Sequence, residues 1–198
     1  MRKYSAGAVK HCFWFAEFRK AVTFLENGLT WEEIRTRSEQ ENIFGSSTPR
    51  RAAEMLQVVS ARIRSLDQSF RPVFLRGDIT TQKTIALIAA MSWDRLFFDL
   101  VYEVIRDKLM IGSDEVTDSD VRTFFRSVQQ RDSTAAKWTD QTCTKLAGSY
   151  KTMLYESGVT NKARTRRTIY RPVLNKELEQ WLKTHELSVM IRALTGEE

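Results

Sequence analysis

The residues with the clearest chemistry in this sequence are the cations that follow Gly158. The stretch between Glu156 and Glu177 contains no acid but six basic residues: Lys162, Arg164, Arg166, Arg167, Arg171 and Lys176. Such a segment carries a strongly positive local field, so we expect it to bind a polyanion. A solvated basic surface without a ligand is the alternative interpretation, since basic loops are common.

Residues suited to catalysis or metal binding are scarce. His11 and His185 supply the imidazoles, and neither lies near a second His or Cys at the spacing of metal ligands. The sequence has no phosphate-binding glycine loop and no nucleophile elbow. The acids of residues 114–120 lack the glycine turn and closing glutamate of a calcium loop. We therefore expect no catalytic residue, no metal and no cofactor, with a nuclease built from scattered carboxylates as the open alternative.

The helix predicted between Thr139 and Gly158 would position these cations. Thr139 can cap its start, and its apolar residues recur at helical spacing: Cys143, Leu146, Ala147, Tyr150, Met153 and Leu154. The opposite face carries Gln141, Lys145, Ser149 and Thr152. Gly158 can end the helix in a left-handed conformation, and residues 160–162 and 171–173 then have the pattern of two short strands around a basic loop.

An earlier helix is predicted to pack against this one. Thr117, with Asp118 and Asp120, forms an N-terminal cap before the amphipathic stripe Val121, Phe124, Phe125 and Val128. Two helices joined over residues 131–138 and followed by a basic hairpin are the layout of a winged helix-turn-helix. In that layout the second helix reads base edges in the DNA major groove, and flanking cations contact phosphates. We expect base contacts from Gln141, Lys145, Ser149 and Thr152, and contacts to the DNA backbone or minor groove from Arg164, Arg166 and Arg167, with Lys162 and Arg171 beside them.

The N-terminal part is predicted to be helical throughout. Apolar stripes predict helices over residues 8–26, 30–41, 48–66 and 78–106, with a possible kink at Ser92. Gly112 and Ser113 interrupt the pattern, so we expect a helical domain at residues 1–112 and a winged-helix-like domain at residues 113–198. The predicted fold class is mainly α, with one short β-hairpin.

A second phosphate site is predicted at the start of the helix that begins near residue 48. Thr48 has the character of an N-cap, and Pro49 suits the first helical position. Arginines in a first turn oppose the helix dipole unless an anion is bound there. The candidate residues are Ser47, Thr48, Arg50 and Arg51, and a solvent-facing cap is the alternative.

Composition limits the classes of protein to consider. The chain has 198 residues, is 42% hydrophobic and carries a net charge of +6 with a pI near 9.4, which favours polyanionic partners. Cys12 and Cys143 are too few for a disulfide framework, and no signal peptide opens the chain, so we expect a cytoplasmic protein. The longest apolar run, residues 85–91, is too short to span a membrane, although the basic surface leaves peripheral attachment open.

Several short blocks give the chain a resemblance to a known family. These are Tyr4–Gly7, Thr30–Ile34, Glu41–Phe44, Ser47–Arg51, Ala61–Ile63 and Gly158–Leu174. In their order and spacing the sequence resembles the BrxA family of bacteriophage-exclusion (BREX) defence systems. The resemblance implies a small, non-enzymatic, all-helical DNA-binding component that works beside a methyltransferase, an ATPase and a phosphatase-like protein. It assigns no individual DNA contact.

The leading hypothesis is a protein that binds double-stranded DNA and has other BREX proteins as possible partners. An adaptor whose basic hairpin docks on an acidic defence protein is the second hypothesis. A transcriptional repressor is the third, although repressors usually dimerise on paired half-sites and no dimer seam is recognisable in the pattern.

Overall fold

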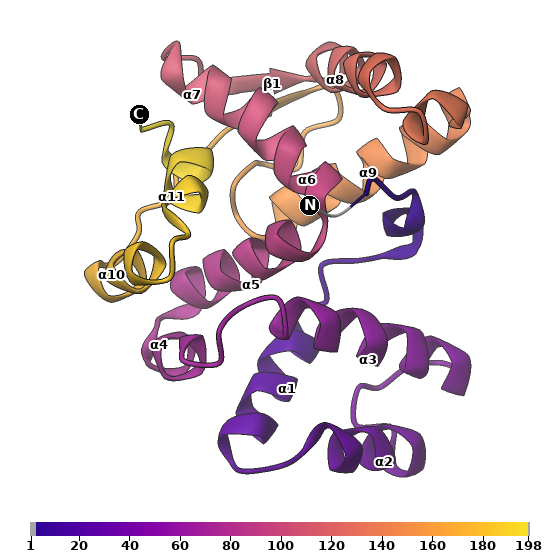
Figure 1. The fold of residues 1–198 in the computed structure, drawn as a ribbon, viewed down its shortest axis with the longest axis vertical. Helices are drawn as coiled ribbons and strands as arrows, with labels where there is room; N and C mark the ends of the chain where they lie inside the picture. The colour runs from indigo at the N-terminus through magenta and orange to yellow at the C-terminus, as the bar shows by residue number, and fades with distance from the viewer. Residues whose placement is uncertain (1–2, 198) are drawn as a thin grey trace.

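The computed structural model describes residues 3–197, and helices dominate it (Figure 1). The N-terminal half contains η1 (Gly7–Lys10), α1 (Phe15–Glu26), α2 (Trp31–Glu41), α3 (Pro49–Ile63), α4 (Phe70–Arg76) and α5 (Ile79–Trp93). There follow α6 (Arg95–Leu100), η2 (Val101–Arg106), α7 (Asp107–Met110), β1 (Glu115–Thr117), α8 (Asp118–Arg131), η3 (Ala135–Lys137), α9 (Asp140–Glu156), β2 (Arg166–Thr168), α10 (Lys176–Thr184) and α11 (Ser188–Thr195). The mainly α fold expected from the sequence is confirmed.

Side-chain caps fix where most of these helices begin. Thr30 and Glu33 form a capping box at α2, and Thr117 and Asp120 form another at α8. Thr48 accepts a hydrogen bond from the Arg51 amide at the start of α3, as predicted. These hydrogen bonds satisfy amide groups that have no partner inside the helix, so short polar residues before an apolar stripe predict helix starts well.

The first helix begins later than the sequence predicts. The apolar pattern predicted a helix from Ala8, but the chain forms η1 and then turns at Trp14, whose φ is 52°, so that α1 begins at Phe15. The extended turn frees the carbonyl groups of Cys12 and Phe13, and both accept hydrogen bonds from the buried guanidinium of Arg62. A long-range contact of this kind leaves no periodic signal in the sequence.

The helix predicted over residues 78–106 is divided into several parts. It breaks at Asp94, whose side chain accepts hydrogen bonds from the Leu96 and Phe97 amides and so caps α6. Beyond Leu100 the chain widens into the π-helix η2 and then tightens again into α7. Short π-helical segments are uncommon and often lie near functional sites.

The small sheet differs from the predicted hairpin. β2 pairs antiparallel with β1, which precedes α8, so that Val116 lies opposite Arg167. Thr160 forms only an isolated bridge to Ile169, and residues 171–173 form no strand. The prediction that residues 160–162 and 171–173 pair as two strands around the basic loop is therefore wrong. Residues 115–117 are too few to show a strand pattern before a helix cap.

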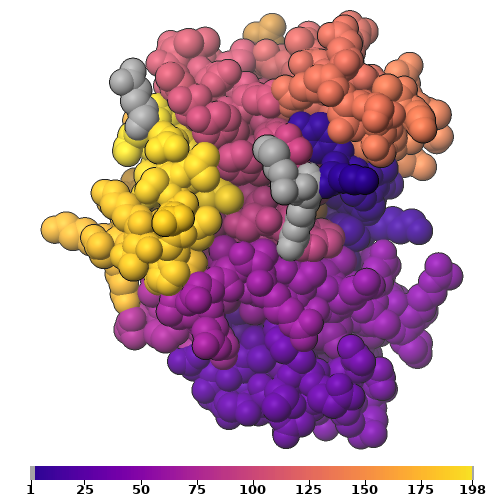
Figure 2. All heavy atoms as spheres, viewed as in Figure 1, coloured from indigo at the N-terminus to yellow at the C-terminus, as the bar shows by residue number. Residues whose placement is uncertain are grey.

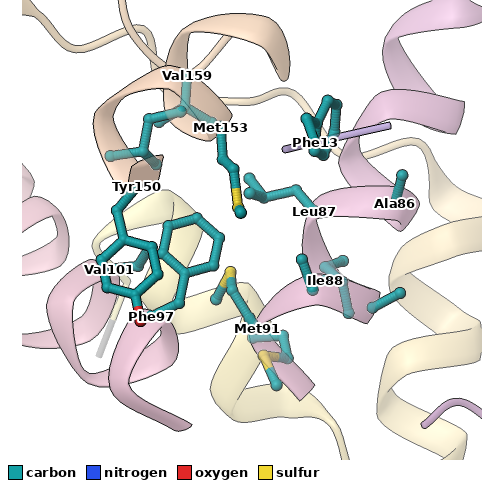
Figure 3. Packing of buried hydrophobic residues seen from close by; sticks show 14 of the residues in the cluster. Phe13, Ala86, Leu87, Ile88, Met91, Phe97, Val101, Tyr150, Met153 and Val159 are labelled. Atoms are coloured by element: carbon teal, nitrogen blue, oxygen red, sulfur yellow. The ribbon is translucent and has the colours of Figure 1, made fainter. Parts of the chain in front are cut away.

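A shared hydrophobic cluster joins the two halves of the chain. α5 is buried on almost every side, and its Leu87 and Met91 lie toward Met153 of α9 in Figure 3. Phe97 of α6 stacks on Tyr150 of α9 with ring centroids 4.9 Å apart. α10 and α11 cover one flank beside α4 and η2 (Figure 2). The residues predicted as two domains therefore pack on a common core, which holds α9 rigidly against α5 and α6.

None of the helices among residues 3–197 combines the length and the apolar character needed to cross a membrane.

Candidate nucleic-acid interface

A buried polar cluster anchors α9 to the rest of the molecule. The Tyr150 hydroxyl donates a 2.8 Å hydrogen bond to Asp94 at the junction of α5 and α6. Arg62 of α3 is 2% exposed and interacts electrostatically with the same carboxylate. Burial raises the pKa of Asp94 and of Tyr150, and lowers the pKa of Arg62 to about 10. Because removing one member would leave the others with unmatched buried charge, we expect the cluster to fix the orientation of α9.

The outer face of α9 presents most of the residues predicted to contact bases. Gln141, Lys145 and Thr152 are exposed along one stripe of the helix. Ser149 is different, because its hydroxyl donates a hydrogen bond to the Val9 carbonyl in the N-terminal segment, which packs along α9 (Figure 1). Ser149 is therefore engaged within the chain at that edge of the helix, and its contact with a base stays a prediction.

Gly148 lies on the same outer stripe and has no packing role that the structure reveals. A methyl group placed there would meet no atom within 4 Å. Glycine inside a helix costs roughly 0.5–1 kcal/mol relative to alanine. Gly148 therefore lowers the stability of α9. It also leaves a flat surface that the backbone of another molecule can approach closely.

The loop after Thr160 exposes four of its five predicted contact residues. Lys162, Arg164, Arg166 and Arg171 are all exposed. The Lys162 ammonium lies 5.8 Å from the centre of the Tyr155 ring, and Arg166 lies 3.5 Å from Glu115 across the two strands. An exposed pair of that length contributes little to stability, so both cations stay available to a ligand.

Arg167 does not project from the loop as predicted. It is 9% exposed, its guanidinium pairs with Asp118 at 2.9 Å, and it also donates to the Arg164 carbonyl. Lys151 of α9 donates to the same Asp118 oxygen at 3.0 Å. Burial raises the pKa of Asp118, but the hydrogen bonds from Lys151 and Arg167 outweigh it, so the pKa lies below its usual value. Arg167 of β2 and Lys151 of α9 therefore meet at the Asp118 carboxylate of α8, and a contact of Arg167 with DNA stays a prediction.

Two further cations on α8 were missed by the sequence reasoning. Arg122 and Arg126 are exposed and, within residues 3–197, neither forms an intramolecular salt bridge. They line a groove of about 320 Å³ between α8 and α9, together with Thr144 and Lys151. Their spacing of four residues, beside the apolar stripe of α8, is the signal that could have found them.

The predicted second phosphate site is largely occupied by contacts within the chain. Arg51 stacks on Trp14, with 4.7 Å between its guanidinium carbon and the ring centre, and pairs with Glu54 at 3.0 Å. It also donates to the Lys10 carbonyl, so it is not a free anion ligand. Ser47, Thr48 and Arg50 are exposed, and the Thr48 hydroxyl accepts a hydrogen bond from the Arg51 amide.

Metal-ligating residues do not cluster in the part of the chain that the structure describes. No group of three or more His, Cys, Asp or Glu side chains is placed to hold an ion there. Both cysteines are free, and burial, followed by the charge of Asp140, raises the pKa of Cys143.

Fold and surface together define a mainly α protein that exposes a cationic surface on α8, α9 and the loop that follows. A family model described as BrxA matches residues 2–186. A BREX protein BrxA from Bacillus cereus (strain H3081.97) is 33% identical over 183 residues, which cover 92% of each chain. The chain therefore belongs to the BrxA family, as the resemblance of its short blocks implied.

A solved structure shares the fold. The crystal structure of an uncharacterized protein from Magnetospirillum magneticum superposes with a TM-score of 0.81 over 99% of this chain and 100% of that one. At 19% identity the likeness concerns the fold alone.

Proposed function

We propose that this BrxA-family chain binds double-stranded DNA, without catalysing a reaction, as a component of BREX phage defence. The observation that carries the proposal is the group of exposed cations around α9. Lys145, Arg164, Arg122 and Arg126 have no intramolecular salt bridge within residues 3–197, and Arg166 has only a weak one. A surface that keeps this many cations unneutralised is the electrostatic footprint expected of a phosphate-binding protein.

The connectivity around α9 supports a winged helix-turn-helix as the mode of binding. β1, α8, α9 and β2 follow one another along the chain, β2 pairs with β1, and Thr160 bridges to Ile169 beyond β2. This order leaves the loop of residues 161–165 beside the N-terminus of α8, where the Asp118 amide donates to the Thr165 carbonyl. In our proposal α9 enters the major groove, and the loop cations hold the adjacent backbone.

The outer stripe of α9 suits a close approach to DNA. Gln141 and Thr152 can exchange hydrogen bonds with base edges, and Lys145 can donate to guanine or to phosphate. Gly148 between them keeps the stripe flat at its centre. Asp94 and Tyr150 hold the opposite face of α9, so the helix can bind as a preformed element.

Fluorescence anisotropy with a short labelled duplex tests the proposal. The double variant Arg164→Ala, Arg166→Ala should bind all sequences roughly tenfold or more weakly at low salt, because two phosphate contacts are lost. The control is Arg19→Ala, Arg35→Ala, which removes two exposed cations from α1 and α2. Equal losses in the two double variants, or no binding by the unmodified protein, would refute the proposed surface.

A further inference from the structure

The side of α8 that faces away from α9 carries a second groove. It has a volume of about 370 Å³ and lies between α8 and the segment formed by η2 and α7, which meet at the upper surface in Figure 2. Val104 of η2 and Phe124 of α8 contribute its buried apolar residues, and Ile111 stands at its edge. Ile111 is 76% exposed and the preceding Met110 is 44% exposed. Two adjacent exposed apolar residues beside a groove mark a place where another molecule can dock.

The charges that line this groove are opposite in sign to those of the proposed DNA surface. Glu103, Asp107 and Asp120 line it against the single cation Lys108, in a chain whose net charge is +6. Both carboxylate oxygens of Glu103 accept hydrogen bonds from Arg131. Asp120 pairs with Lys108 and accepts a hydrogen bond from the Thr117 amide. Asp107 is the available carboxylate, since its side chain is 60% exposed and its contact with Arg106 is a 3.3 Å pair between neighbours in sequence.

We propose that this groove docks an amphipathic helix of another protein, through an apolar ridge against Ile111, Val104 and Phe124 and a Lys or Arg opposite Asp107. Charge complementarity identifies the occupant, because carboxylates repel phosphate and attract a basic side chain. The apolar floor excludes a purely ionic contact and suits the i, i+3 and i+4 anchors of a helix in a groove. Because the groove lies on the other side of α8 from Arg122 and Arg126, docking does not require DNA to leave.

A charge-swap experiment with synthetic peptides tests the docking site. The probe is a fluorescein-labelled amphipathic peptide with a leucine ridge and lysines on its flanks, and the matched peptide replaces each lysine by glutamate. Fluorescence anisotropy should show the lysine peptide binding the unmodified protein more tightly than the glutamate peptide. Ile111→Ser should weaken both peptides, roughly tenfold for the lysine peptide, because their shared apolar anchor is lost.

Asp107→Lys should weaken the lysine peptide and strengthen the glutamate peptide, which a nonspecific attraction to the whole protein would not reproduce. Val173→Ser is the control, since it replaces an apolar residue that is 86% exposed outside the groove. An unaltered preference in Asp107→Lys, or an equal loss in Val173→Ser, would overturn the proposal. A concentration-dependent dimer that Ile111→Ser abolishes in light scattering would also overturn it, because the occupant would then be a second copy of this chain.

Discussion

The two sides of α8 offer a direct comparison. Three cations, Arg122, Arg126 and Lys151, line the groove shared with α9 against the two acids Asp118 and Asp140. Three acids, Glu103, Asp107 and Asp120, line the groove shared with η2 and α7 against the single cation Lys108. Both grooves are of similar size, at about 320 and 370 Å³. The two grooves differ in the balance of charge, so one amphipathic helix separates a surface with an excess of cations from one with an excess of carboxylates.

On each side of α8, ion pairs within the chain neutralise some charges and leave others exposed. On the α9 side Asp118 is neutralised by two cations, Lys151 and Arg167, so that the arginines of α8 remain free for a ligand. On the other side Asp120 pairs with Lys108 and accepts a hydrogen bond from the Thr117 amide in the capping box. Asp107 remains exposed there. Internal pairing therefore decides which charges a partner meets.

Charge reversal on α8 should give the largest effect. The double variant Arg122→Glu, Arg126→Glu should lower duplex affinity roughly a hundredfold or more at low salt, because two attractions to phosphate become repulsions. Both residues are exposed, so the free energy of unfolding should change by less than about 0.5 kcal/mol. The matched variant Asp107→Lys, on the opposite side, should leave duplex affinity unchanged or slightly higher. Similar losses from both variants in anisotropy titrations would remove the distinction between the two sides.

Arg166 and Arg167 should differ in how much each contributes to the stability of the fold. Arg167→Ala should lower the free energy of unfolding by about 2 kcal/mol, because it breaks a nearly buried charged hydrogen bond to Asp118. Arg166→Ala should cost less than about 0.5 kcal/mol, since its pair with Glu115 is exposed. Urea denaturation measures both changes. If the two substitutions cost the same, the structural role assigned to Arg167 is mistaken.

Gly148→Ala should have a smaller and opposite effect on stability. The free energy of unfolding should rise by up to about 1 kcal/mol, because alanine favours the helix and the site has room for a methyl group. Duplex affinity should nevertheless fall, since the methyl group projects from the centre of the outer stripe of α9. A more stable protein with unaltered affinity would show that α9 does not approach DNA closely.

Acidification should weaken the N-terminal packing on α9 before it weakens the ion pairs of Asp118 and Asp120. Burial, followed by the charge of Arg62, lowers the pKa of His11 from 6.5 to about 4. Between these values the unfolded chain binds the extra proton, so stability should decline as pH falls from about 6.5 toward 4. The pKa values of Asp118 and Asp120 lie below 3.8, so their contributions are lost only at lower pH. Urea midpoints across this range should fall less steeply for His11→Asn.

Local signals predicted much of the fold. The helix starts at Thr30 and Thr117, the caps Thr48 and Thr139, and the buried stripe of α8 all lie where the sequence places them. The late start of α1 and the pairing of β2 with β1 depend on contacts between distant residues, such as Arg62 with the Phe13 carbonyl. Periodicity within a window of residues cannot register such contacts.

The sequence predicted the basic character of the candidate site better than the contacts of its individual residues. Charge runs identified the loop cations, and helical spacing identified the outer stripe of α9. Sequence distance could not show that Asp118 would capture Arg167, or that Val9 would cover Ser149. The spacing of Arg122 and Arg126 can be read from the sequence, but their place in a candidate site depends on the groove that α9 forms beside them.

The salt dependence of duplex binding is the sharpest test of whether the cations of α8, α9 and the following loop bind DNA. With roughly five phosphates neutralised, the logarithm of the association constant should fall with the logarithm of salt concentration at a slope of about −4 to −5. The Arg122→Glu, Arg126→Glu variant should show a shallower slope, by about 2, because two contacts no longer release counterions. A flat response in the unmodified protein, or the same slope in the variant, would contradict the assignment of this side of α8 to DNA.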